Sequence, residues 1–170
     1  YLSRQGAAGI AKAVLVSSVL PFRLRTDDNP GGTEQAAFDK TAQALNEDRA
    51  KFYTGFFAKF FGVGTGAPPV SDELLAWAHG VAMQGSLRAA LEALKAFSST
   101  DFRPDMAAFT LPTLFIHGTD DATVPIDASS RPAAALVPGS TLIEYEGAPH
   151  GLFATHKARL TRDLLDFIGA

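Results

Sequence analysis

Cysteine is missing from this 170-residue sequence. Its absence excludes disulfide bonds, cysteine-ligated zinc sites and a thiol nucleophile. Charge is sparse and nearly balanced, since charged residues make up 19% of the chain and 15 Lys and Arg stand against 18 Asp and Glu, a formal net charge of −3. The basic residues are scattered and form no stripe, so we expect no nucleic-acid partner.

Long apolar runs are lacking as well. No stretch of about 18 uninterrupted apolar residues occurs, and the first residues do not have the layout of a signal peptide, so we expect no membrane partner and a cytoplasmic location. The four histidines do not show a metal-ligand spacing. We therefore expect neither a metal site nor another cofactor.

Apolar residues nevertheless make up 46% of the chain, enough for an ordinary globular core. Short apolar runs bounded by turn residues predict three strands, and the first is expected to be buried on both faces. Helical spacing predicts three consecutive helices after the first strand, with Trp77 in their core, and one helix after each later strand. The strands are expected within 11–20, 111–118 and 141–145, the helices begin near 33, 71, 86, 129 and 153, and a break falls at 62–69.

Strand, helices, strand, helix, strand, helix is the order of an α/β fold with a parallel sheet. We assign residues 1–32 and 99–170 to the α/β core and residues 33–98 to an inserted helical layer. Thr33, Ser71 and Ser86 are the expected N-caps of the three inserted helices.

Two polar segments follow consecutive predicted strands. Asp120 and Asp121 come soon after the second strand, and His150 lies in Gly147–Gly151 after the third. The carboxyl ends of parallel strands share one edge of the sheet, so a carboxylate and an imidazole are expected to meet there. Such a pair suits general base catalysis, because the carboxylate holds one ring nitrogen and leaves the other free. Taken singly, an Asp pair is also typical of a turn or N-cap, and a His before Gly of a structural contact.

The same segments resemble those of a known family. His117–Pro125 resembles the acid-bearing loop of α/β-hydrolases, and Gly147–Gly151 resembles their histidine loop. The resemblance extends over Asn29–Gly32 and Asp101–Met106, and it is greatest to the bacterial cofactor-free haloperoxidases (non-haem chloroperoxidases) and aryl esterases. It implies that Asp121 is the catalytic acid and His150 the catalytic base. His117 is expected to form local hydrogen bonds rather than to react.

The nucleophile of that family is a serine in a G-x-S-x-G turn, which precedes the acid and the histidine in the chain. Only two glycine pairs here are four residues apart, and they enclose Gly64 and Pro149. No nucleophile is therefore expected in this chain. Tyr1–Arg4 resembles the later part of the helix that follows the turn, so we expect the C-terminal part of an α/β-hydrolase fold, inactive without its N-terminal part. An apolar strand at 13–16 would otherwise expose an open sheet edge.

The resemblance implies a serine hydrolase for small carboxylic esters, with hydrogen peroxide as an alternative to water in a perhydrolase. It also implies that residues 33–98 form a cap, with Phe56 and Phe57 beside an acyl pocket that Thr123, Val124 and Ile126 border. Two alternatives stay open. One is an inactive interaction module that binds a partner or a second copy through its open sheet edge. The other is an aspartate-nucleophile dehalogenase or epoxide hydrolase.

Overall fold

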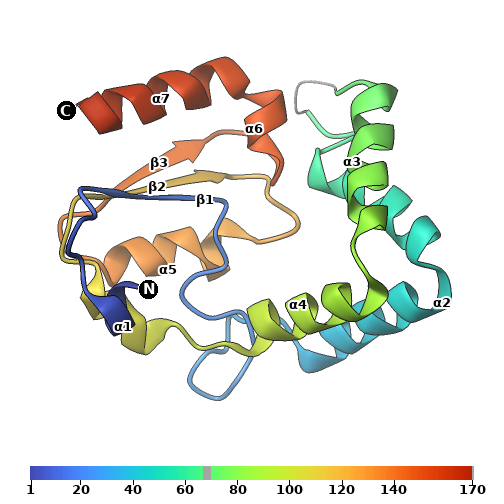
Figure 1. The fold of residues 1–170 in the computed structure, drawn as a ribbon, viewed down its shortest axis with the longest axis horizontal. Coiled ribbons are helices and arrows are strands. Elements are labelled where there is room, and N and C mark those ends of the chain that lie inside the picture. Colours follow the sequence, from blue (N-terminus) through green and yellow to red (C-terminus); the bar gives the residue numbers. More distant parts are fainter. Residues whose placement is uncertain (67–69, 170) are drawn as a thin grey trace.

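The computed structural model describes residues 1–66 and 70–169 (Figure 1). Three strands form one parallel sheet, in which Leu15 lies opposite Phe115 and Ile116 lies opposite Ile143. Their order across the sheet is β1 (Ala13–Val16), β2 (Thr113–Gly118) and β3 (Thr141–Tyr145). The predicted α/β architecture with a parallel sheet is confirmed. The part of the predicted break that falls on residues 67–69 lies outside the described residues.

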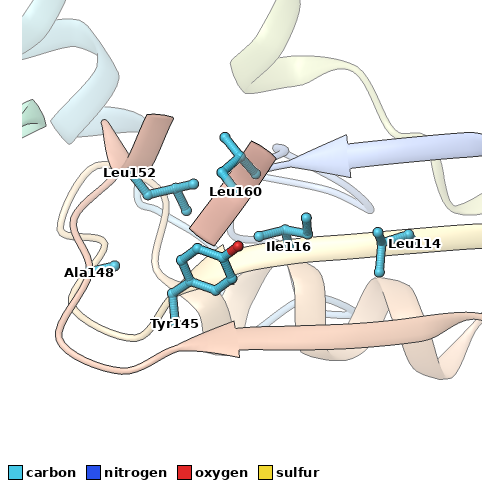
Figure 2. Packing of buried hydrophobic residues seen from close by; sticks show 6 residues of the cluster. All are labelled: Leu114, Ile116, Tyr145, Ala148, Leu152 and Leu160. Carbon is cyan, nitrogen blue, oxygen red and sulfur yellow. The ribbon is translucent and has the colours of Figure 1, made fainter. Parts of the chain in front are cut away.

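Strand β2 is buried along its whole length because it lies between the other two strands and between two layers of helix. Its side chains alternate between the faces, as the pleat of a strand requires. Leu114 and Ile116 pack against Tyr145 and against Leu152 and Leu160 of the C-terminal helices (Figure 2). Phe115 points to the other face, where its cluster contains Met106, Ala133 and Val137.

The helices that cover these two faces are short apart from the last one. The first face is covered by α6 (Leu152–Thr155) and α7 (Lys157–Gly169), and the second by α5 (Ser130–Ala135) (Figure 1). Short 3₁₀ helices form at Arg103–Ala108 and Ile126–Ala128, and α1 (Leu2–Gln5) precedes the sheet.

Three helices follow one another between β1 and β2, and Figure 1 shows them beyond the carboxyl ends of the strands. They are α2 (Gln35–Phe60), α3 (Asp72–Gln84) and α4 (Leu87–Ser99). Ser71 and Ser86 cap α3 and α4 as predicted, accepting hydrogen bonds from the backbone N–H groups of Leu74 and Ala89. The expected cap Thr33 is wrong, because Glu34 is the residue before α2. The helix is also interrupted at Asp48, whose φ and ψ are −155° and 88°.

Two burial predictions are wrong. Trp77 was expected in the core, but 62% of it is exposed. Helix α3 buries Ala78 instead, the neighbouring position and so a different face of the helix. All four residues of β1 are only half-buried, because β1 stands at the edge of the described sheet rather than between two strands.

Candidate active site

The loops that follow β2 and β3 lie directly against each other. Gly118 and Tyr145 are register partners at the ends of the two strands. Beyond them, the N–H of Thr119 donates to Tyr145 O at 3.0 Å and the N–H of Asp120 donates to Ala148 O at 3.1 Å. A Cβ atom on Gly118 would lie 2.0 Å from Ala148 O, so this approach requires glycine. The backbone contacts bring the predicted acid and histidine together.

Asp121 and His150 form a short hydrogen bond. Nδ1 of His150 lies 2.6 Å from Oδ2 of Asp121. The side chain of Asp121 is 0% exposed, and its other carboxylate oxygen accepts from the backbone N–H groups of Thr123 at 2.9 Å and Val124 at 2.7 Å. The side chain of His150 is 17% exposed. Because the ionised carboxylate can only accept, Nδ1 carries the hydrogen and Nε2 keeps its lone pair.

The surroundings of Asp121 favour its charged form. Burial raises the pKa of this carboxyl. Hydrogen bonds from His117 and His150, the charge of His150 and the N–H of Val124 lower the pKa by more than burial raises it, to about 2. The group is therefore an ionised acceptor at neutral pH. A buried carboxylate that stays ionised can hold an imidazole in one orientation and stabilise its protonated form.

The histidine loop is fixed from two further sides. The ring of Phe60, at the end of α2, lies edge-on to His150 with the two ring centroids 4.7 Å apart. Ser17 donates its hydroxyl hydrogen to His150 O at 3.1 Å, and its own N–H donates to Ile116 O at 2.9 Å. The φ of Ser17 is 48°, in the left-handed region that few residues other than glycine adopt. The sequence does not single out Ser17 as a site residue, although a polar residue at the end of an apolar strand is a signal.

Arg23 was also missed. It is 4% exposed, and its Nη2 donates to Oγ1 of Thr33 at 3.1 Å and to the Thr123 carbonyl at 3.5 Å. Its Nε and Nη1 have no hydrogen-bond partner within the described ranges. Burial lowers the pKa of this guanidinium, and the charge of Asp121 counteracts that change. A buried cation therefore lies beside the acid loop, a feature that composition does not signal.

The five predicted pocket residues occupy different surroundings. Val124 and Ile126 are buried, and the hydroxyl of Thr123 is buried without a hydrogen-bond partner among the described residues. Phe57 borders an apolar groove of about 210 Å³. Phe56 stacks on Phe52 within α2, with ring centroids 5.7 Å apart. The other large side chains along the groove are Phe60, Phe61, Trp77, Val81 and Phe153.

A second apolar depression, of about 480 Å³, lies along β1. Tyr1, Leu2, Val14, Leu20 and Phe109 are among its lining residues. Within residues 1–66 and 70–169, no strand pairs with the outer edge of β1. This edge therefore offers both unpaired backbone groups and apolar surface.

Neither a membrane-crossing helix nor a metal-ligand cluster is found among the described residues. No helix in this part of the chain is both long and apolar enough to span a bilayer. The same residues contain no group of three or more His, Asp or Glu side chains that could hold a metal ion.

Comparison with known proteins decides the family. The model of the alpha/beta hydrolase fold family matches residues 1–157. The chain belongs to the α/β-hydrolase family. The match includes both the loop of Asp121 and the loop of His150, and it confirms the resemblance that those loops carry.

Individual α/β-hydrolases are similar over the whole chain. This chain is 39% identical over 171 residues to the non-heme chloroperoxidase of Streptomyces lividans, and the alignment covers 99% of this chain and 61% of that protein. It is 36% identical over 171 residues to a bifunctional esterase/perhydrolase of Acinetobacter calcoaceticus, with coverage of 99% and 61%. The crystal structure of a bromoperoxidase from Bacillus anthracis has a TM-score of 0.94 and 34% identity, covering 100% of this chain and 62% of that one. The chain thus spans about three-fifths of the length of these relatives.

Proposed function

We propose that Asp121 and His150 are the acid and the general base of a serine hydrolase that cleaves small carboxylic esters. The observation that carries this proposal is the 2.6 Å hydrogen bond between Nδ1 of His150 and a buried carboxylate whose pKa is about 2. It keeps the hydrogen on Nδ1, so that Nε2 is the basic atom. The position at two adjacent strand ends supports the proposal, because active sites of parallel α/β sheets form there.

The chemistry that such a pair performs is acyl transfer. The serine oxygen bonds to the ester carbonyl carbon while the serine proton moves to Nε2 of His150. His150 then passes that proton to the departing alkoxide, which leaves as the alcohol, and an acyl-serine remains. Water attacks the acyl-serine, giving its proton to His150, and the serine oxygen regains a proton as the acid departs. If hydrogen peroxide attacks instead of water, the product is a peracid, which is the perhydrolase variant of the same cycle.

The serine is supplied by a segment outside these 170 residues that docks along the outer edge of β1. Three observations support this step. The sequence contains no G-x-S-x-G turn, and the chain spans about 61% of the length of its relatives. The edge of β1 offers unpaired backbone groups beside an apolar depression of about 480 Å³. On this proposal the 170-residue chain has no esterase activity by itself.

Residues 33–98 form a cap that shapes the substrate pocket. Phe60 supports this assignment because its ring contacts His150, which links the end of α2 to the proposed base. The groove beside Phe57 is lined by apolar side chains, which favours a substrate whose acyl group carries no charge. Phe56, Thr123, Val124 and Ile126 stay predicted pocket residues.

The test is hydrolysis of a short-chain aryl ester. The chain alone is expected to be inactive, and the chain joined to the nucleophile-bearing N-terminal segment of a relative is expected to turn over. His150→Ala and Asp121→Asn in the joined protein should each abolish most of that turnover, while His79→Ala serves as the matched histidine control. Full activity in His150→Ala, or no activity in any joined protein that folds, would contradict the proposal.

The open edge of β1 also favours a second candidate function, a non-catalytic interaction module. In that case the outer edge of β1 pairs with a partner or with a second copy of this chain. Ester hydrolysis that depends on His150 excludes this candidate. A joined protein that folds but never turns over, together with concentration-dependent association of the 170-residue chain, favours it.

A further inference from the structure

A second histidine contacts the carboxylate of Asp121. His117 lies near the end of β2 and is 0% exposed, so it meets neither solvent nor substrate directly. Its Nε2 lies 3.0 Å from Oδ2 of Asp121 and 2.8 Å from the carbonyl oxygen of Val124. Its Nδ1 lies 2.6 Å from Oγ of Ser130 at the start of α5. Both ring nitrogens therefore have partners.

These partners fix the location of the hydrogen on the neutral ring. The Val124 carbonyl has only lone pairs to offer, so Nε2 must carry the hydrogen. That N–H donates to the Val124 carbonyl, and Oδ2 of Asp121, 3.0 Å from the same nitrogen, is its second acceptor, while Nδ1 accepts from the hydroxyl of Ser130. His117 thus serves as a hydrogen-bond donor to Asp121 without needing a charge.

The carboxylate of Asp121 then has four donors, two on each oxygen. Oδ1 accepts from the backbone of Thr123 and Val124, and Oδ2 accepts from His150 and His117. Two backbone donors on Oδ1 locate one end of the carboxylate. On Oδ2, His117 lies 3.0 Å away and is the neighbour besides His150.

We propose that His117 is a positioning residue, whose Nε2–H holds Oδ2 of Asp121 in line with Nδ1 of His150. This inference rests on the proposed function of the Asp121–His150 pair. Contacts run from Ser130 through His117 to Asp121 and His150. Helix α5, which begins at Ser130, is thereby connected to the proposed base through a residue of the central strand β2. An additional donor on Oδ2 also withdraws electron density from it, which weakens its pull on the hydrogen of His150.

The charges around this pair fit the proposed role. After burial, which raises the pKa of Asp121, the hydrogen bond from His117 is the largest influence on that pKa, and it lowers it. Other charged or titratable groups near the two residues include His150, the exposed Asp120 next to Asp121, Arg23 from the loop after β1, and Glu144 of β3, whose carboxylate pairs with Arg131. Glu144 is occupied by Arg131 at 2.6 Å, so it does not compete for the N–H of His117.

The test compares two replacements of His117 in the joined protein. His117→Leu removes the donor, whereas His117→Gln places an amide N–H near the former Nε2. We expect His117→Leu to lower kcat about tenfold, the worth of one hydrogen bond to a charged group, with KM within about twofold. The acid limb of its pH–rate profile should move toward alkaline pH, because Oδ2 then attracts the hydrogen of His150 more strongly. His117→Gln should recover kcat to within about threefold of the unaltered protein.

Two controls separate positioning from general stability. Val137→Ala loosens the layer between β2 and α5, in the cluster with Met106, Phe115 and Ala133. It should lower the melting temperature without moving the pH–rate profile. Ser130→Ala removes the outer hydrogen bond but leaves the Nε2–H donor, and it should cost no more than about threefold in kcat.

The titration of Asp121 can also be measured directly, without enzymatic turnover, in variants that have little activity. In carbon-13 NMR titrations, the carboxyl of Asp121 should titrate at higher pH in His117→Leu than in the unaltered protein, whereas in His117→Gln, which keeps a donor, it should titrate close to the unaltered protein. An unchanged Asp121 titration, with an unchanged pH–rate profile, in folded His117→Leu would overturn the proposal. If His150→Ala and Asp121→Asn keep full activity, the proposed function fails instead. If those two abolish turnover and both His117 variants match the unaltered protein, only the role of His117 fails.

Discussion

The N–H of Gly151 donates to the carbonyl oxygen of Phe60 at 2.7 Å. This hydrogen bond joins the residue after the proposed base directly to the last residue of α2. Together with the edge-on contact between the Phe60 and His150 rings, it ties the position of the histidine loop to the inserted helices. The geometry of the site therefore depends on residues about ninety positions apart in the sequence.

Replacing Gly151 should disrupt this junction. In Gly151→Ala, the new Cβ would lie 2.4 Å from Cδ1 of Phe61, a ring that is itself buried. We expect a loss of about 1–3 kcal/mol in the free energy of unfolding, measured by urea denaturation, because the ring must move out of its packing. Gly80→Ala in the open middle of α3 is the control, with an expected gain of about 0.5–1 kcal/mol. Equal effects of the two substitutions would contradict a tight junction.

The buried carboxylate should make stability depend on pH in the acid range. The pKa of Asp121 falls from 3.8, its ordinary value, to about 2 in the folded chain. The unfolded state therefore binds the proton more readily, and stability of about 2 kcal/mol that is present above pH 4 is lost as the pH falls through 2.

The free energy of unfolding is measured against pH for the unaltered chain and for Asp121→Asn. The difference between the two isolates the contribution of Asp121 from that of the other carboxylates. Asp28→Asn is the control, since Asp28 has a lowered pKa as well but is exposed. Its effect should be small and should vanish in high salt. An Asp121→Asn chain with the same pH dependence as the unaltered one would show that Asp121 is not ionised in the fold as described.

Arg23 is expected to cost stability rather than supply it. Its guanidinium is buried. Among the described residues it forms no ion pair with a carboxylate, and its Nε and Nη1 have no hydrogen-bond partner. Arg23→Met keeps the length of the side chain and removes the charge, so we expect an unfolding free energy that is unchanged or about 1 kcal/mol higher. Arg23→Ala, which leaves a cavity, should be destabilised. A loss of several kcal/mol in Arg23→Met would mean that its bonds to Thr33 and Thr123 outweigh the cost of burial.

The exposed position of Trp77 can be tested by the same measurement. Trp77→Ser should change the unfolding free energy by about 1 kcal/mol or less, because most of the indole already meets solvent. Phe61→Ala, at a ring 2% exposed, should cost about 3–5 kcal/mol. If the two losses are similar, Trp77 is covered in solution by a surface that the described residues do not supply.

Much of the fold could be predicted because its signals are local. The apolar run Thr113–Gly118 and the caps Ser71 and Ser86 act over a few residues, and each was found where the sequence indicated. One local prediction, the cap Thr33, is wrong by a single position, since Glu34 precedes α2. The burial errors fall where distant segments decide the outcome. Trp77 lies at a helical spacing that suits a core, but whether a neighbour covers it depends on how α3 packs on α2.

The sequence by itself determined the order of strands and helices, the type of sheet, and the two strand-end segments that hold Asp121 and His150. It could do so because parallel strands present their carboxyl ends at one edge, whatever the detailed packing. Only the tertiary structure decided which side chains support that pair. Ser17, Arg23 and His117 reach it from separate segments, through contacts whose lengths are fixed by how the layers pack and not by any spacing along the chain.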